Sequence, residues 1–575
     1  MSKTQKLKFI ISVNIFLISL NLFSQNFQWA RTYDSSKYSV ILDIDVDTEG
    51  NLYSTGFFNG YVDFDPALET YNYLFCDTSE GDIFISKLDS NGVFQWVISL
   101  GSQFSYGEHT NSIKVDSNGD IIVTGIFYDT VDFDPSENVY NMTSLGYPNT
   151  FICKYDSNGN FIWGKQFESS SSSSIEGKEL FISDSHIYVV GSFTGIVNFD
   201  AGVSNFSLSS YGNTSDIFFC KLDLLGNFIW AKKIGNSGGD FGNSIFVDSN
   251  NYLYITGKFW GNVDFDPSAS AFYLNSAGYN DIFLAKYDNL GHFVYAKGLP
   301  GTLYADSGKS IKVDLNGNIY LAGTFRGTVD FDTSENQFNL TSNGDNDIFI
   351  SKFNSNFDLI WAKKIGGISY DSATSLSINN QTNSIYITGL FEDVVDFDPS
   401  NMSHNLNSNG GYDFFVAKFD MDSNFIWAGS FGGNQPTNYG LNDVGYSIVS
   451  KFNNIYFGGS FEGTVDFDIT PNNFNYTNIS GYKNAFICKY EEPVLNISEE
   501  TTSPLLYPNP FENNINVILN KPSLIIIYNL LGKEVFRKSA INSCDINLSS
   551  LKNGYYIINV KDNNSTYRLK LFKSK

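Results

Sequence analysis

The chain has 575 residues, too many for one hydrophobic core, so its length predicts several domains or an array of repeats. Glycine (49), tyrosine (35) and phenylalanine (52) are abundant while proline (13) and methionine (4) are scarce, a balance typical of short aromatic strands joined by tight turns and not of a helical protein. With 61 acidic and 36 basic residues the formal net charge is -25, which argues against nucleic acid as a partner and leaves cations, basic proteins and neutral glycans.

The first 25 residues are predicted to be a secretory signal peptide. Three lysines precede an apolar stretch over 9–23, and the small or polar residues Ser24 and Gln25 follow it. The alternative is an N-terminal membrane anchor, but polar residues interrupt this stretch, whereas a bilayer span needs about 20 unbroken apolar residues. Once the signal is removed, we expect no transmembrane segment.

Residues 26–490 contain one sequence unit repeated seven times. In the unit over 310–367, the segments SIKVD, NIYLAG and DIFISKF have strand length, turns of the DLNGN kind separate them, and a WAKKIG segment follows. Four strands per unit with no helical pattern between them predict an all-β fold, a seven-bladed β-propeller in which each unit is one blade. The string VDFD, or VNFD in the third copy, marks the units and starts at Val62, Val131, Val197, Val263, Val329, Val395 and Val465.

The aromatic fourth segment predicts how the ring closes. It has counterparts at Trp29, Trp96, Trp163, Trp230, Tyr295, Trp361 and Trp427, but none follows the last DIF-like segment over 485–490. If this strand is the outermost of each blade, FQWARTY over 27–33 must complete the seventh blade and close the ring.

The repeat resembles the bacterial β-propeller repeat family called SBBP. The family pattern SIxVDxxGNxYxTGxF, then DxFxxKxD, then a tryptophan strand matches from about residue 27 to residue 490, although VDFD is inserted between the second and third strands. The resemblance implies architecture, because the family has no single activity. A lysine found at one position in all seven units is expected to be structural, salt-bridged or with its stem packed on the strand.

The VDFD inserts supply the candidate metal ligands. Their aspartates alternate with apolar residues, so two carboxylates project from one face of each insert except the third, where Asn198 replaces one. Together the thirteen carboxylates are expected to give one face of the propeller a ring of acid. Calcium is the candidate cofactor, but it takes about six to eight oxygens and one motif offers two, so solvated strand and turn aspartates are the alternative. The aspartates singled out are Asp63, Asp65, Asp132, Asp134, Asp264, Asp266, Asp396 and Asp398.

Residues that do not repeat are the candidates for ligand binding. Trp260 is the one tryptophan outside the fourth-strand position, and Glu108 and His109 share an unusual inter-blade loop. An exposed aromatic residue beside polar loops suits stacking on a sugar, and packing against the adjacent insert is the alternative. The string GNSGG over 235–239 has the GxSxG spacing, but no helical pattern follows it, so it is not the strand-to-helix elbow of a serine hydrolase. The sequence contains no HExxH or phosphate-loop motif. We therefore expect a non-catalytic scaffold for an extracellular glycan, protein or polymer, with a propeller hydrolase or lyase as the alternative.

A second domain follows the repeats. Residues 491–504 are polar, acidic and end in proline, as expected of a linker. Residues 505–575 contain LYPNPF, LIIIYNLLGKEVF, INLSSLKNGYYIINV and TYRLKLFK, short strands separated by glycine or asparagine turns that suffice for a small Ig-like β-sandwich.

These four segments resemble, in order, the type A sorting domain of the type IX secretion system of Bacteroidota. The resemblance implies recognition by that secretion machinery, transport across the outer membrane, and release or surface attachment; an ordinary Ig-like module is the alternative. The expected location is therefore the medium or the outer-membrane surface. The residues that carry the match are Tyr507, Pro508, Asn509, Pro510, Gly532, Gly554, Lys570 and Lys573.

Overall fold

The computed structural model describes residues 26–574 except 68–69, 77–79, 103–106, 146, 201–204, 303, 335, 434–442, 471, 479–480, 493–504, 508–510, 520–521, 530–532, 542–543 and 562–565. The predicted signal peptide and most of the predicted linker therefore lie outside the described residues. All regular structure in the described part of the chain is β. The chain divides into two compact units, Met1–Glu492 and Pro493–Lys575, which we describe separately.

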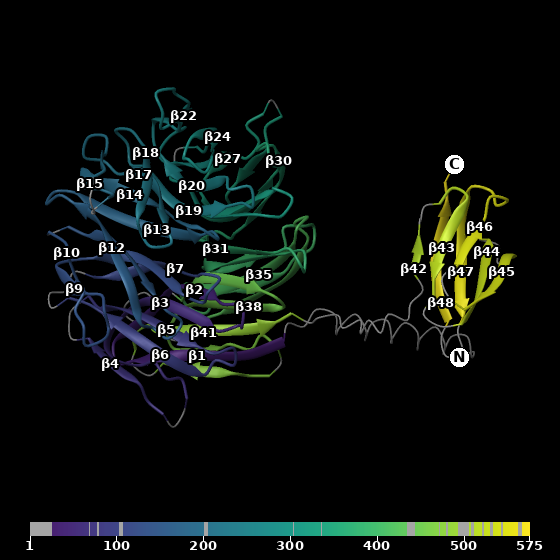
Figure 1. Cartoon of the computed structure of the whole chain (residues 1–575), viewed down its shortest axis with the longest axis horizontal. Coiled ribbons are helices and arrows are strands. Elements are labelled where there is room, and N and C mark those ends of the chain that lie inside the picture. The colour runs from purple at the N-terminus through teal and green to yellow at the C-terminus, as the bar shows by residue number, and fades with distance from the viewer. Residues whose placement is uncertain are drawn as a thin grey trace. The chain divides into compact units, whose positions relative to one another are not determined.

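The first unit is built from runs of four antiparallel strands, each joined to the next run by a short connection (Figure 1). Seven such runs, called here the first to seventh sets, are found among the described residues. They are β2 (Tyr38–Val46), β3 (Leu52–Asp63), β5 (Asp82–Leu88) and β6 (Phe94–Leu100); β7 (His109–Val115), β8 (Ile121–Phe127), β11 (Asn149–Tyr155) and β12 (Phe161–Ser169); β13 (Ser174–Ile182), β14 (His186–Thr194), β17 (Asp216–Asp223) and β18 (Phe228–Ile234); β19 (Phe241–Val247), β20 (Leu253–Phe259), β23 (Asp281–Tyr287) and β24 (Phe293–Leu299); β25 (Ser307–Val313), β26 (Ile319–Phe325), β29 (Asp347–Phe353) and β30 (Leu359–Ile365); β31 (Ser372–Asn379), β32 (Ser384–Phe391), β35 (Asp413–Asp420) and β36 (Phe425–Phe431); and β37 (Val444–Lys451), β38 (Asn454–Phe461), β41 (Asn484–Glu491) and β1 (Asn26–Ser35).

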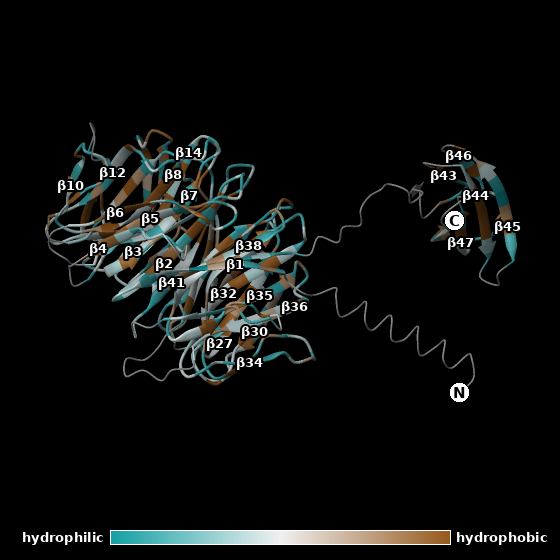
Figure 2. Ribbon diagram, turned by 90° about the horizontal axis from the view of Figure 1, so that it is seen from below, coloured by the Kyte–Doolittle hydropathy of each residue, from teal (hydrophilic) through white to brown (hydrophobic). Residues whose placement is uncertain are grey.

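The first strands of the sets form a closed inner ring. Each first strand contacts the first strand of the next set, and β37 of the seventh set returns to contact β2 of the first. Figure 1 shows these strands toward the middle of the unit and the fourth strands further out. Neighbouring sets share hydrophobic cores: Tyr320 and Ile348 of the fifth set, for example, pack in one cluster with Ile387 and Phe415 of the sixth. Figure 2 shows hydrophobic residues concentrated in the strands.

The N-terminal strand completes the seventh set, as the sequence predicts. β1 pairs antiparallel with β41, with Trp29 opposite Lys489 and Tyr33 opposite Ala485. At its end β1 also pairs with β3 of the first set, and the Tyr33 hydroxyl lies 2.8 Å from Ser86 Oγ of that set. β1 therefore joins the last set to the first.

Short hairpins follow the second strands at the VDFD motifs. In the first set the hairpin is formed by the end of β3 and β4 (Tyr73–Cys76). The remaining hairpins are β9 (Thr130–Asp132) with β10 (Asn141–Thr143), β15 (Ile196–Asn198) with β16 (Ser207–Ser209), β21 (Asn262–Asp264) with β22 (Tyr273–Asn275), β27 (Thr328–Asp330) with β28 (Asn339–Thr341), β33 (Val394–Asp396) with β34 (Asn405–Asn407), and β39 (Thr464–Asp466) with β40 (Asn475–Thr477).

The repeated lysine links neighbouring sets. The ammonium of Lys87 donates to the Ser157 carbonyl in the next set at 2.9 Å and lies 5.0 Å from the centre of the Tyr53 ring in its own set. The carbonyl that accepts from Lys87 also accepts from the Trp96 indole at 3.2 Å. The equivalent lysines Lys221, Lys352 and Lys489 make the same kind of bond to Asn289, Met421 and Ser90. This geometry explains a repeated lysine by packing rather than by catalysis.

The second unit consists of two antiparallel sheets over one core. β42 (Leu505–Tyr507), β43 (Asn514–Ile518) and β46 (Cys544–Asn547) form one sheet, and β45 (Glu534–Ala540), β44 (Ser523–Asn529), β47 (Gly554–Lys561) and β48 (Thr566–Lys573) form the other. Buried side chains of both sheets, among them Ile515, Ile527 and Ile558, belong to a single cluster. The alternation of apolar and polar residues along these strands supplies that core.

Candidate functional site

The VDFD aspartates hold the insert hairpins in place. In the fourth set, Asp264 Oδ1 accepts the backbone N–H of Asp266 at 3.1 Å and of Phe272 at 2.8 Å. Asp266 Oδ1 in turn accepts the N–H of Ser268 at 2.9 Å. The same bonds recur at Asp63, Asp65, Asp132, Asp134, Asp396 and Asp398. These aspartates therefore act first as acceptors for turn backbone.

Calcium binding at the inserts stays a prediction. Six of the seven motifs bring two carboxylates and the third brings one. The Oδ1 atom of each aspartate singled out already accepts at least one backbone N–H group. Over the ranges that the structure describes, no group of three or more His, Cys, Asp and Glu side chains is placed to hold a metal ion.

Another group of aspartate carboxyls is deeply buried, and the sequence did not predict it. One aspartate begins the third strand of a set, and another precedes the first strand of the next set. In the pair formed by Asp281 and Asp306, Asp306 Oδ1 accepts the Arg326 N–H at 2.8 Å, while its Oδ2 has no hydrogen-bond partner. The other pairs are Asp216 with Asp240, Asp347 with Asp371, and Asp413 with Asp443.

Burial raises the pKa of all these carboxyl groups above the usual value of aspartate, to about 6 for Asp216, Asp281 and Asp347. Desolvation, helped by the neighbouring Asp281 carboxylate, raises the pKa of Asp306 to about 8. Desolvation likewise raises the pKa of Asp443 to about 8 and that of Asp240 and Asp371 to about 7. The sequence holds a signal for the pairs that was overlooked: the third strand begins with aspartate in most units, but with Asn149 and Asn484 in the second and seventh.

These shifts predict that the propeller loses stability as pH rises from 5 to 8. A raised folded-state pKa means that the fold holds a proton that the unfolded chain releases near pH 4. The contribution of each such group to the free energy of unfolding is therefore fully present below pH 4, and it falls with rising pH until the folded-state pKa is passed. The fall should be about 1 kcal/mol per pH unit for each such group. Urea unfolding of the full chain at pH 5, 6, 7 and 8 measures it.

Asp306→Asn should reduce this pH slope, because the amide keeps an oxygen for the Arg326 N–H but does not titrate. The exposed Asp184→Asn serves as the matched control and should leave the slope unchanged. A free energy of unfolding that stays constant or rises between pH 5 and 8 would contradict the assignment of buried, protonated carboxyls.

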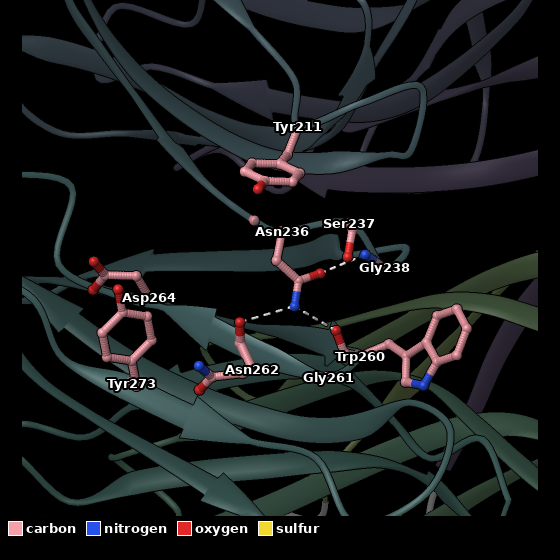
Figure 3. Close-up of a pocket in the computed structure, with 10 residues that line it drawn as sticks. Tyr211, Asn236, Ser237, Gly238, Trp260, Gly261, Asn262, Asp264 and Tyr273 are labelled. Atoms are coloured by element: carbon pink, nitrogen blue, oxygen red, sulfur yellow. Dashed lines mark hydrogen bonds between the residues drawn. The ribbon is translucent and has the colours of Figure 1, made fainter.

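Trp260 lies in a groove of about 600 Å³ between the third and fourth sets. Tyr211 and Asn236 come from connections in and after the third set, and Trp260, Asp264 and Tyr273 come from the fourth. Figure 3 shows Asn236 in the middle of these residues, with the two tyrosines and the Trp260 indole on different sides of it. The residues from the third set lie well before Trp260 in the sequence, so no local sequence motif predicts the groove.

Backbone-directed hydrogen bonds fix the walls of the groove. The Asn236 side-chain amide donates to the carbonyls of Trp260 and Asn262, each at 2.9 Å, and its oxygen accepts from Gly238 N–H (Figure 3). The Trp260 N–H donates to Asp240 Oδ1 at 2.9 Å. A Cβ at Gly238 would stand 2.6 Å from the Trp260 carbonyl oxygen, so this close approach requires glycine.

Three aromatic side chains of the groove are open to solvent. Tyr211 is 59%, Tyr273 57% and Trp260 44% exposed. The indole N–H of Trp260 donates to the Gly278 carbonyl at 3.0 Å, and its ring lies 6.3 Å from that of Tyr279, which fixes its orientation. Rigid aromatic faces beside amide and carboxylate groups can stack on a flat apolar face and hydrogen-bond to hydroxyls.

The other two predicted ligand residues do not belong to this groove. Glu108 is only 1% exposed, its Oε1 accepts from the Ser102 hydroxyl, and burial raises its pKa. The Glu108 side chain is therefore not exposed at the surface, and its role in ligand binding stays a prediction. His109 is the first residue of β7 rather than a loop residue, and its Nε2 lies 3.5 Å from Glu176 Oε1.

The predicted sorting residues fall partly on described positions. Gly554 begins β47 with a φ of 143°, which a side chain would strain. Lys570 and Lys573 lie in β48, and the buried ammonium of Lys573 donates to the Leu548 and Ser549 carbonyls at 2.8 and 2.9 Å. Tyr507 ends β42. Pro508, Asn509, Pro510 and Gly532 lie outside the described residues.

Two sequence families match parts of the chain. Residues 505–574 match a secretion system C-terminal sorting domain, and residues 229–263 match the β-propeller repeat called SBBP. The described residues include no helix long and apolar enough to cross a membrane.

The chain is also similar to two curated proteins over parts of their length. An uncharacterized WD repeat-containing protein, L264, of Acanthamoeba polyphaga mimivirus is 25% identical over 462 residues, which cover 66% of this chain and 32% of that protein. The regulatory protein FlaEY of Caulobacter vibrioides is 27% identical over 201 residues, covering 34% and 20%. The chain thus spans about a third or less of the length of these relatives.

Two solved structures show a distant likeness to the chain. A protein of unknown function from Bacteroides caccae is 9% identical with a TM-score of 0.29, and the match covers 64% of this chain and 94% of that one. The Vibrio cholerae biofilm matrix protein Bap1 is 10% identical with a TM-score of 0.20, and the match covers 95% and 82%.

Proposed function

Because the chain carries an SBBP β-propeller repeat and a C-terminal sorting domain of the type IX (Por) secretion system, we propose that it is an exported seven-bladed propeller that binds a neutral extracellular glycan without catalysis. The sorting domain indicates secretion or attachment at the outer-membrane surface. The seven sets correspond to seven blades, and the closed ring of first strands together with the pairing of β1 and β41 supports this number. In this proposal the two-sheet second unit is an Ig-like sandwich that directs export.

The observation that carries the binding role is the groove around Asn236. It combines three exposed aromatic rings with amide and carboxylate groups in a space of about 600 Å³, within the usual size of a ligand site. Aromatic stacking and hydrogen bonding are the two contacts that a neutral sugar offers, since its ring has an apolar face and a hydroxyl edge. The walls of the groove are fixed before any ligand binds, which lowers the entropy cost of binding.

A non-catalytic role is supported by the lining of the groove. Its described residues include one carboxylate, Asp264, whose Oδ1 already accepts two backbone N–H groups, and no histidine. The histidines occupy separate places: His292 is paired with Asp288 in an exposed turn, and His404 contacts the Ala428 carbonyl. A general acid and base positioned on one substrate are what a hydrolase or lyase would need.

We predict that Tyr211→Ala and Trp260→Ala each weaken glycan binding about two- to tenfold, because each change removes a stacking face worth about 0.5–1.5 kcal/mol. A neutral-glycan array of the full chain identifies the ligand, and calorimetry measures its affinity for each variant. Tyr147→Ala, which removes a tyrosine exposed outside the groove, is the matched control and should bind normally. The proposal fails if the array retains no neutral glycan, or if both groove variants bind as tightly as the unchanged chain.

A further inference from the structure

Each first strand contains a β-bulge at the same place. The pairing of first and second strands shifts by one residue in every set, so one residue per first strand is left without a partner. All of these displaced residues line a single cavity of about 430 Å³ at the centre of the inner ring. They are Leu42, Asn111, Lys178, Asn243, Lys309, Thr374 and Tyr446.

The displaced position varies although its neighbours repeat. The following residue is serine in most sets, and its hydroxyl accepts a backbone N–H from the adjacent set, as Ser244 does from Ile311 at 3.1 Å. In two sets a carboxylate takes that place: Asp43 accepts from Ile113 and Glu179 accepts from Ile245, each at 2.9 Å. The repeated position is therefore explained by a hydrogen bond that the fold requires. The displaced residue that lines the cavity differs in identity from set to set, so it can suit an asymmetric ligand.

Positive charge gathers on one side of this cavity. Lys178 and Lys309 line it, and Lys258 on β20 is close enough to influence Lys309. Lys178 contacts Glu176, but among the described residues neither Lys258 nor Lys309 forms an ion pair. Lys258 instead lies 4.7 Å from the centre of the Phe241 ring. Burial and the ammonium groups of Lys258 and Lys178 lower the pKa of Lys309 to about 8.

The acidic groups near the cavity are already paired. Asp43 bonds the ammonium of Lys114 at 2.7 Å, and Glu179 bonds that of Lys312 at 3.3 Å. Glu176 is shared between Lys178 and His109, and those contacts hold its pKa well below its usual range. Lys258 and Lys309 thus present uncompensated charge in a protein of net charge -25.

We propose that this central cavity binds a sugar acid, a small hydroxylated carboxylate, whose anionic group lies against Lys309 and Lys258. The volume fits a ligand of monosaccharide size, and Thr374, Tyr446 and the serines of the lining offer partners for hydroxyl groups. The site uses residues different from those of the Asn236 groove, so this proposal and the glycan proposal are tested independently.

Calorimetric titration of the full chain with sodium glucuronate tests the site, with glucose and sodium sulfate as comparison ligands at constant ionic strength. Glucuronate should bind, while glucose and sulfate should bind at least tenfold more weakly, because glucose lacks the charge and sulfate lacks the hydroxyl contacts. Lys309→Gln and Lys258→Gln should each lower the affinity for glucuronate about tenfold, and Lys165→Gln, at an exposed lysine on β12, should leave it unchanged.

Proton uptake gives a second measurement that is specific to Lys309. A bound anion stabilises the charged ammonium, so at pH 8 binding should take up a fraction of a proton, seen as a heat that depends on the ionisation enthalpy of the buffer. This uptake should vanish in Lys309→Gln. The absence of glucuronate binding, equal binding of sulfate, or unchanged affinity and proton uptake in Lys309→Gln would each overturn the proposal. Thermal unfolding confirms that the variants are folded.

Discussion

Deleting residues 26–35 is expected to remove most of the stability of the propeller. These residues form β1, which supplies the outer strand of the seventh set and buries Trp29, Ala30 and Tyr33. Burial of each large side chain contributes about 2–3 kcal/mol, and the deletion also exposes the edge of β41. The summed loss approaches the whole stability of a typical domain. Thermal unfolding followed by circular dichroism should show a transition that is much lowered or no longer cooperative.

Single substitutions in β1 show whether its buried side chains stabilise the ring, as distinct from an effect of merely shortening the chain. Tyr33→Ala removes packing against Phe64 and Phe84 and the contact with Ser86, and should cost about 3–5 kcal/mol. Gln28→Ala changes an exposed side chain of the same strand and should have little effect. An unchanged melting temperature in the deleted chain would show that β1 does not hold the ring closed.

The strands and the closing strand were predictable because they depend on local patterns. Strand-length apolar runs between turns of the DSNG and DLNG kind repeat at a nearly constant spacing. The missing aromatic strand after 485–490 pointed to the N-terminal segment as its replacement. The calcium prediction shows where such reasoning stops. Alternation placed the two aspartates of a VDFD motif on one face, but their acceptance of turn N–H groups depends on the hairpin that forms around them.

The groove and the central cavity could not be predicted because they are assembled across sets. Asn236 and Trp260 are held together by a hydrogen bond between segments that no periodicity relates. The residues in the cavity are selected by the bulges, which exist only in the pairing of two strands. The variable position just before each SIKVD-like segment therefore carried no visible signal in the sequence. The burial of Glu108 could not be predicted either, because it depends on tertiary packing and not on the local sequence.

The second large effect concerns export. The C-terminal unit has a hydrophobic core of its own, made of residues within 511–571, so removing it should leave the propeller folded. The signal peptide predicted over 1–25 would carry the chain across the inner membrane only. Deleting residues 505–575 should therefore trap a folded propeller in the periplasm. The full chain with Tyr147→Ala serves as the control and should be exported normally.

Fractionation of cells that possess the type IX system, with immunodetection of the propeller in periplasm, outer membrane and medium, tests this account most directly. The account predicts that the full chain is found at the outer surface or in the medium and that the chain lacking residues 505–575 accumulates in the periplasm. Equal amounts of the two proteins outside the cell would contradict it.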